Sequence, residues 1–166
     1  MILVLRPFRV GEYISAGTVV GTVQDVGLFA TELKTIDGLY VLAPNSSLWN
    51  TPVTNYSRMK TRMHEFKVGI GYEDNIDQAF AIIKKIVEDQ KGVLSTPAPA
   101  YFVSQLGDSA VVLSANYWIN SADYAQVSRH TIKTVKIEFD KAGINIPYPQ
   151  MTYHVIEKDN KTETVN

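Results

Sequence analysis

The chain has 166 residues, 45% of them hydrophobic, which is enough for one medium domain or two small ones with real apolar cores. Its 16 Lys and Arg residues nearly balance its 17 Asp and Glu residues, which argues against a general nucleic-acid binder, since such proteins usually carry a strong basic excess. The absence of cysteine excludes disulfides, thiolate nucleophiles and cysteine-based zinc sites.

The chain opens with a short apolar run, Met1 to Leu5, which stops at Arg6-Pro7. A membrane-spanning helix needs roughly 20 apolar residues, and no segment of the sequence approaches that length. The run also lacks the charged start of a signal peptide. Two interpretations stay open at this point. The run is an edge strand or unordered start, or it is the cut end of a longer apolar helix.

Residues 10 to about 57 are rich in Val, Thr and Gly, a composition that favours short strands with glycine bends and a small barrel or sandwich. Asp37-Gly38 predicts a hairpin with a type I′ turn, because that turn needs positive φ at both central residues. Asn45 is expected to cap a short helix over Ser46 to Trp49. The predicted strands are Tyr13-Ile14, Thr18 to Val26, Leu28 to Thr35 and Leu39 to Ala43.

The rest of the chain has a different pattern. A strand over His64 to Tyr72 precedes a helix that begins at Asn75, where Gln78 completes a capping-box pattern. Strands over Tyr101 to Leu106 and Val111 to Ile119 follow. A second helix over Ala122 to Ala142 ends at Gly143, and Ile144-Asn145-Ile146 returns as a strand. The order is β-α-β-β-α-β, typical of ferredoxin-like domains. Four side chains of the second helix are expected inside: Val127, Ile132, Val135 and Phe139.

A further strand is predicted over Met151 to Ile156, after the rigid Pro147-Tyr148-Pro149 segment. Both of its faces carry bulky side chains, and the chain offers it no obvious partner. A lone strand of this kind indicates pairing between subunits.

Residues with catalytic or metal-binding chemistry are scattered. His64, His130 and His154 lie far apart and share no ligand spacing, and no serine has a nucleophile-elbow context. The sequence therefore predicts no catalytic residue, no metal site and no cofactor.

The densest basic stretch contains Arg58, Lys60 and Arg62, whose alternation would place them on one face of an extended segment. A solvated connector between domains, an anion-attracting surface and a contact with nucleic-acid phosphates all fit this stretch.

The motifs, taken together and in order, resemble the cytoplasmic region of the small-conductance mechanosensitive channel (MscS-like) family, from Arg6 to about Ile156. The residues that carry the resemblance are Arg6-Pro7-Phe8-Arg9-x-Gly11-Glu12-Tyr13, Gly21-Thr22-Val23, Thr35-x-Asp37-Gly38, Pro44-Asn45, Asn55-Tyr56-Ser57-Arg58, the helix start from Tyr72 to Gln78, Phe139-Asp140-x-Ala142-Gly143-Ile144 and Pro147-Tyr148-Pro149-Gln150.

The resemblance implies an α+β fold in which a small Sm-like β-barrel domain precedes a ferredoxin-like β-α-β-β-α-β domain and a C-terminal oligomerisation strand. It implies five segments: 1–9, the end of a pore-lining helix and its junction; 10–60, a middle β-domain; 61–147, the α/β domain; 148–157, the strand of an inter-subunit barrel; and 158–166, a polar tail.

The implied function is that of a non-enzyme: the vestibule on the cytoplasmic side of the cell membrane, which screens ions and solutes before the pore of an osmotically activated channel. The implied partners are other copies of the chain in a homoheptamer, inorganic ions and small solutes, and the membrane through preceding helices; nucleic acid is not expected. The implied membrane junction is Arg6, Pro7 and Phe8; the implied portal residues are Arg58, Lys60 and Arg62; and the implied inter-subunit strand carries Pro149, Gln150, Met151, Tyr153 and Val155.

Two alternatives use the same ferredoxin-like fold. An RNA-binding module would retain RNA in a salt-dependent manner, although the strands lack the aromatic set that stacks bases. A small-molecule-sensing module would be stabilised against heat by a metabolite.

Overall fold

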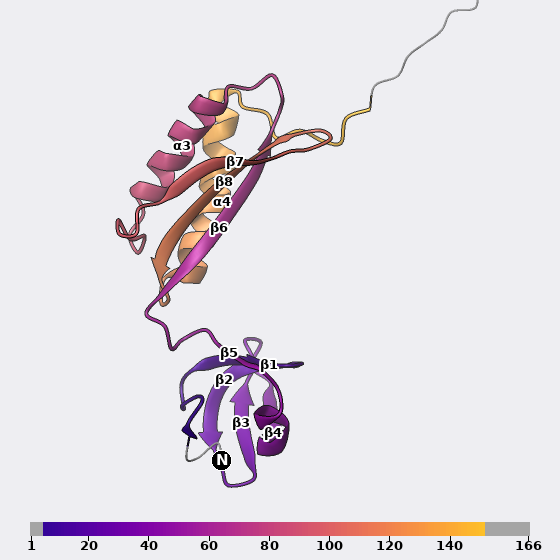
Figure 1. Ribbon diagram of the computed structural model, residues 1–166, viewed down its shortest axis with the longest axis vertical. Coiled ribbons are helices and arrows are strands. Elements are labelled where there is room, and N and C mark those ends of the chain that lie inside the picture. Colours follow the sequence, from indigo (N-terminus) through magenta and orange to yellow (C-terminus); the bar gives the residue numbers. More distant parts are fainter. Residues whose placement is uncertain (1–4, 152–166) are drawn as a thin grey trace, which may run out of the picture.

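The computed structural model describes residues 5–151 of the chain. Two domains follow one another along the chain, joined by a short bent segment (Figure 1). Each domain has its own apolar core. The core of the first contains Phe8, Ile14, Val23, Leu33 and Leu48. The larger core of the second is built around Phe66, Ile83, Leu113, Tyr117 and Phe139. Within residues 5–151, no helix is both long enough and apolar enough to cross a bilayer.

The first domain, the β-domain, is a bent antiparallel sheet with the strand order β4-β3-β2-β1-β5. Gly21 lies where two strands pass closely, because a Cβ at this position would be 2.7 Å from the carbonyl oxygen of Lys34. The four predicted strands are present, and a fifth, β5, was not predicted. The elements are β1 (Tyr13–Ala16), β2 (Val19–Val26), β3 (Ala30–Lys34), β4 (Tyr40–Pro44), α2 (Asn45–Trp49) and β5 (Val53–Asn55).

Two local predictions in the β-domain were wrong. The β3–β4 hairpin exists, but its turn is not type I′, because Gly38 has a φ of +91° while Asp37 does not have positive φ. The Asp37 carboxylate instead accepts a hydrogen bond from the hydroxyl of Thr35. Asn45 is the first residue of α2 and not its cap. Its amide nitrogen donates to the carbonyl oxygens of Gly27 and Leu28, so Asn45 fixes the β2–β3 turn.

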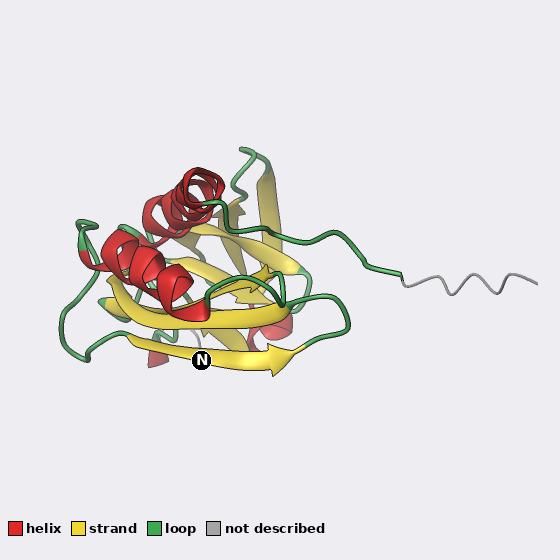
Figure 2. Cartoon of the chain, turned by 90° about the horizontal axis from the view of Figure 1, so that it is seen from above, coloured by secondary structure: helices red, strands yellow, loops and turns green. Residues whose placement is uncertain are grey.

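The second domain, the α/β domain, has an antiparallel sheet with the order β6-β8-β7. The two long helices lie side by side and cover one face of this sheet (Figure 2). Both helix ends that the sequence marks are confirmed: the Asn75 side chain accepts a hydrogen bond from the Gln78 amide, and Gly143 closes the second helix with a φ of +72°. The elements are β6 (Thr61–Ile70), α3 (Ile76–Glu88), β7 (Ala100–Leu106), β8 (Val111–Asn120) and α4 (Tyr124–Ala142).

The α+β fold class is confirmed, but the end of the α/β domain differs from the prediction. Residues 144–146 form no strand, although Asn145 accepts one backbone hydrogen bond from Gly71 at 3.0 Å. On α4, Ile132 is 59% exposed, so its predicted place in the core was wrong. Thr131 is buried instead, because its hydroxyl has a partner in the Tyr117 hydroxyl, 2.9 Å away.

Candidate functional site

The basic stretch that the sequence singles out lies at the junction of the two domains. We define the connector as residues 56–60, which lie between β5 and β6 (Figure 1). These residues form bends, so the prediction of one extended face was wrong for them. The three candidate portal cations, Arg58, Lys60 and Arg62, have different surroundings, and each is described in turn.

Arg58 is held by the β-domain through a bidentate ion pair. Its Nη2 and Nε atoms donate to Glu12 Oε2 at 2.9 Å and to Glu12 Oε1 at 3.2 Å. The same guanidinium reaches the carbonyl oxygen of Arg6 at 3.4 and 3.5 Å. A forked pair of this kind fixes the plane of the guanidinium as well as its position. Arg58 therefore ties the start of the connector to the β-domain.

Glu12 is the centre of this network. The Asn55 side-chain amide donates to its carboxylate at 2.6 Å, and the Arg9 backbone amide donates at 2.8 Å. Burial raises the pKa of Glu12, but hydrogen bonds from Arg58, Asn55 and Arg9 outweigh burial and bring the pKa below its ordinary value of 4.5. Glu12 is therefore ionised at neutral pH and paired with Arg58.

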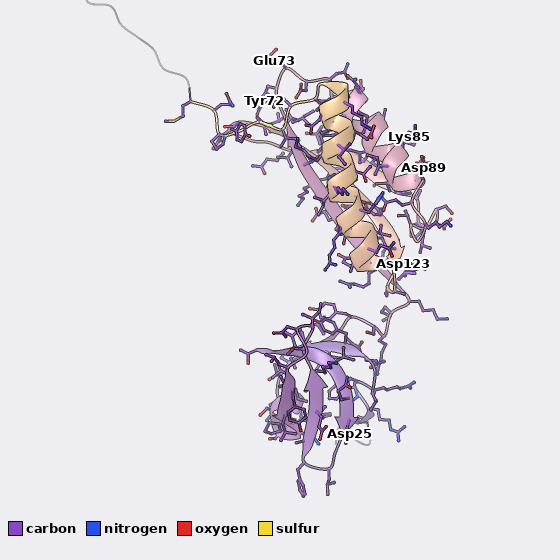
Figure 3. All side chains as sticks on the ribbon, turned by 180° about the vertical axis from the view of Figure 1, so that it is seen from behind. Asp25, Tyr72, Glu73, Lys85, Asp89 and Asp123 are labelled. Carbon is purple, nitrogen blue, oxygen red and sulfur yellow. The ribbon has the colours of Figure 1, made fainter. Side chains whose placement is uncertain are left out.

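The second half of the connector is held by the α/β domain. The Ser121 backbone amide donates to the carbonyl oxygen of Lys60 at 2.8 Å, and the Ser121 hydroxyl donates to that of Met59 at 2.5 Å. Ser121 belongs to the turn between β8 and α4, the same turn as Asp123, which Figure 3 labels at the end of this domain nearest the connector. The two halves of the connector are thus bonded to different domains, the first to the β-domain and the second to the α/β domain.

Arg62 lies at the start of β6, between two tyrosine rings. The carbon of its guanidinium is 3.7 Å from the ring centroid of Tyr124 and 5.2 Å from that of Tyr56. A guanidinium over a tyrosine face is attracted by the negative face of the ring. Tyr124 is the first residue of α4, whereas Tyr56 donates its backbone amide to the Tyr13 carbonyl of β1. Arg62 therefore contacts both domains.

His64 contacts Tyr124, the ring on which Arg62 packs. Its Nδ1 lies 3.2 Å from the Tyr124 hydroxyl, and its ring packs edge-on against Tyr124 and Tyr117. Burial lowers the pKa of His64 below its ordinary 6.5, and the nearby Arg62 cation lowers it further. The neutral imidazole is therefore the form present at neutral pH. Arg62 and His64 are close in the sequence, but nothing in the sequence indicates their tyrosine partners, because Tyr117 and Tyr124 lie 53 to 62 residues further along the chain.

Lys60 differs from both arginines. Its side chain is exposed, and among the described residues it has no ion-pair partner. Lys67, the cation that follows Arg62 along β6, pairs with Glu65 at 2.8 Å. Lys60 is therefore the connector cation whose charge is not offset by a neighbouring carboxylate within residues 5–151.

The predicted membrane junction enters the β-domain directly. Phe8 is 2% exposed and forms part of the apolar core. Arg6 is exposed and has a φ of +44°, and its carbonyl accepts from Arg58. Pro7, between them, is half-buried. The chain before the β-domain is thus anchored by Phe8 and linked to the connector through Arg58.

The predicted inter-subunit strand is only partly described. Pro149, Gln150 and Met151 are exposed and form no strand, and the Gln150 amide donates to the Ser109 hydroxyl at 3.0 Å. Tyr153 and Val155 lie outside the described residues. This leaves the pairing of the strand a prediction.

A groove between α3 and α4 is a further concave feature. Two cavities of about 430 and 450 Å³ share Asp89, Gln90 and His130 along it. Figure 3 labels Lys85 and Asp89 on the α3 side. Over residues 5–151, no three His, Asp or Glu side chains gather closely enough to hold a metal ion. The groove carries both signs of charge and selects no single ligand chemistry.

Comparison with known protein families accounts for both domains. Residues 1–58 match the family described as "Mechanosensitive ion channel, beta-domain". Residues 64–146 match "Mechanosensitive ion channel MscS, C-terminal". The boundary between the two matches, residues 59–63, falls at the end of the connector and the start of β6.

Individual proteins give the same result. An uncharacterised MscS family protein of Archaeoglobus fulgidus is 37% identical over 145 residues, which are 87% of this chain and 51% of that protein. A small-conductance mechanosensitive channel of Edwardsiella ictaluri is 29% identical over 157 residues, 95% of this chain and 55% of that protein. The chain thus spans about half the length of the curated relatives it matches.

The fold has a close counterpart among solved structures. The crystal structure of Helicobacter pylori MscS in the closed state superposes with a TM-score of 0.85 at 23% identity, over 95% of this chain and 62% of that one. At this identity the comparison supports the fold alone.

Proposed function

This chain belongs to the MscS family of mechanosensitive ion channels, and we propose that it forms the vestibule of such a channel on the cytoplasmic side of the membrane. In this proposal several copies form a ring, and solutes reach the pore through openings beside the connectors. The membrane tension that opens the pore acts on preceding helices. This role requires no catalysis, and relatives of the chain are named as channels.

The observation that carries the proposal is the position of Lys60. It lies on the connector between the two domains that match the channel family, exposed and without a carboxylate partner among the described residues. A fixed cation beside an opening raises the local concentration of anions and lowers that of cations. Arg58 and Arg62 were grouped with Lys60 by sequence. Their charges are partly shielded, by Glu12 for Arg58 and by tyrosine rings for Arg62.

Exposed apolar side chains support the ring. Phe29 is 82% exposed, Ile36 86%, Tyr40 64% and Leu42 56%, and all four belong to the β2–β4 part of the β-domain. β4 is an edge strand of its sheet, so its outer backbone groups are available to another chain. Apolar surface beside an open edge is typical of interfaces between subunits.

The experiment uses a chimaera in which this chain replaces the matching domains of a complete small-conductance mechanosensitive channel. The reversal potential is measured in a salt gradient for the wild type, for Lys60→Glu and for the matched control Lys84→Glu, which reverses an exposed charge on α3. We expect Lys60→Glu to shift the preference towards cations and Lys84→Glu to leave it unchanged. Equal reversal potentials for all three would contradict the proposal.

A further inference from the structure

The hydrogen-bond partners of the connector switch from the β-domain to the α/β domain across a single peptide bond, the one between Arg58 and Met59. Before that point, Tyr56 and Ser57 bond to Tyr13 of the β-domain, at 3.0 Å from the Tyr56 amide to the Tyr13 carbonyl and at 2.9 Å from the Tyr13 amide to the Ser57 hydroxyl. Arg58 then pairs with Glu12. After that point, the Met59 and Lys60 carbonyls accept from Ser121 of the α/β domain. The two domains are therefore held separately, and the backbone between Arg58 and Met59 is the place where one can rotate against the other.

Arg62 spans this point. Its guanidinium packs on Tyr124, which is part of α4, and faces Tyr56, which is bonded to β1. The ring of Tyr56 lies 5.8 Å from that of Tyr13, and the ring of Tyr124 lies 5.4 Å from that of His64. A continuous series of ring contacts thus runs from β1 to the core of the α/β domain, with the guanidinium at its centre.

We propose that Arg62 is a positioning residue: its guanidinium clamps the hinge between Arg58 and Met59 and fixes the orientation of the two domains. We call Arg62, Tyr56 and Tyr124 the clamp. The hinge and clamp follow from contacts within this chain. The consequence that the clamp also fixes the position of Lys60 beside an opening rests on the proposed function.

The clamp requires the shape of arginine and not its charge alone. A planar guanidinium can stack on two rings at once, whereas the ammonium of lysine is a strongly hydrated point charge. Arg62→Lys therefore keeps the charge and removes the stacking. Tyr124→Leu removes one ring and leaves every charge unchanged. Tyr124→Phe keeps the ring and loses only the hydroxyl that meets His64, which makes it the matched control.

The first test is limited trypsin digestion of the 166-residue chain, with the rate of cleavage after Arg58, the bond at the hinge, as the readout. Cleavage tracks the fraction of open hinge when opening is fast. We expect about fivefold faster cleavage in Arg62→Lys and Tyr124→Leu, the change that matches the loss of one cation–π contact. Tyr124→Phe should keep the wild-type rate. Circular dichroism excludes global unfolding as the cause. Wild-type rates in both clamp variants would overturn the proposal.

The second test measures the domain orientation directly. The sequence contains no cysteine, so Asp37→Cys in the β-domain and Asp108→Cys in the α/β domain provide the only two thiols for spin labels. Labelled chain is diluted with unlabelled chain so that distances within one chain dominate. We expect one narrow distance distribution in the wild-type and Tyr124→Phe backgrounds and a broad one with Arg62→Lys or Tyr124→Leu. Narrow distributions in all four would overturn the clamp.

The two proposals fail in distinguishable ways. If the clamp variants broaden the distance distribution but Lys60→Glu does not change the reversal potential, the screening function is overturned and the hinge proposal stands. An effect of Lys60→Glu with unchanged distances in the clamp variants would do the reverse.

Discussion

Among single residues, the three cations of the junction differ: Arg58 and Arg62 are held by neighbouring side chains, whereas Lys60 is exposed. Glu12 of the β-domain pairs with Arg58, whereas Arg62 contacts Tyr56 on the β-domain side and Tyr124 of the α/β domain. A sequence pattern treats the three cations as equivalent, because it records charge and spacing alone. The contacts that distinguish them come from Glu12 and Tyr124, 46 and 62 positions away from their partners in the chain.

Because burial and the Arg62 cation disfavour the charged form of His64, we expect the stability of the junction to depend on pH. Its pKa in the folded protein lies below its ordinary 6.5 through burial and the Arg62 cation, so the unfolded chain binds more protons as the pH falls. The charged and titratable groups that face it are Arg62, Tyr117 and Tyr124. Its stabilising contribution is fully present above pH 6.5 and is lost as the pH falls through the lowered pKa.

We therefore predict that the free energy of unfolding, measured by urea denaturation, decreases as the pH is lowered from 7.5 towards 5. His64→Asn should flatten this dependence, because asparagine does not titrate. His130→Asn is the matched control: it removes an exposed histidine on α4 and should keep the wild-type slope. A wild-type slope in His64→Asn would show that another group is responsible.

Among the helices and strands, the two long helices are determined by neighbouring residues and are predicted correctly, whereas β5 depends on pairing with a distant segment and is not predicted. The Asn75 cap, the Gly143 termination and the two long helices follow from residues within a few positions of one another, and the sequence predicts them correctly. β5 is only three residues long and exists because it pairs with β1, some 40 positions earlier, so no periodicity marks it. Residues 144–146 have strand-like composition, but a single backbone hydrogen bond, from the Gly71 amide to the Asn145 carbonyl, links them to the segment that follows β6, which is too little for a ladder.

The buried face of α4 shows how hydrophobicity misleads where helical spacing is correct. Val127, Thr131, Val135 and Phe139 follow one another at intervals of four and are all buried. Ile132 is apolar, but it lies one position beyond Thr131 and points away from the core. Hydrophobicity favoured the wrong residue, since the threonine hydroxyl is satisfied by Tyr117 and by the Val127 carbonyl.

This correction is testable with two alanine substitutions on the same helix. Phe139→Ala removes a 0% exposed ring and should lower the free energy of unfolding by about 3–5 kcal/mol. Ile132→Ala removes a side chain of similar hydrophobicity that is 59% exposed, and should change it by about 0.5 kcal/mol or less. Chemical denaturation measures both. Comparable losses would contradict the assignment of the buried face.

At the scale of the whole molecule, both domains are accounted for by one family, and the candidate site lies between them. Resemblance of motifs predicted the family and the α+β class, and the comparisons confirmed both. The proposed ring uses surfaces that a single chain leaves open: the β4 edge and the exposed apolar side chains around it. One copy of the chain cannot enclose a vestibule, so the proposed function requires the chain to self-associate.

The most direct test of that claim is the solution mass of the chain, measured by light scattering over a series of concentrations. We predict a species close to the mass of a heptamer, with dissociation only at the lowest concentrations, because the β4 edge and the apolar side chains beside it are exposed in the single chain. A monomer at every concentration would contradict the claim that this chain carries its own assembly surfaces.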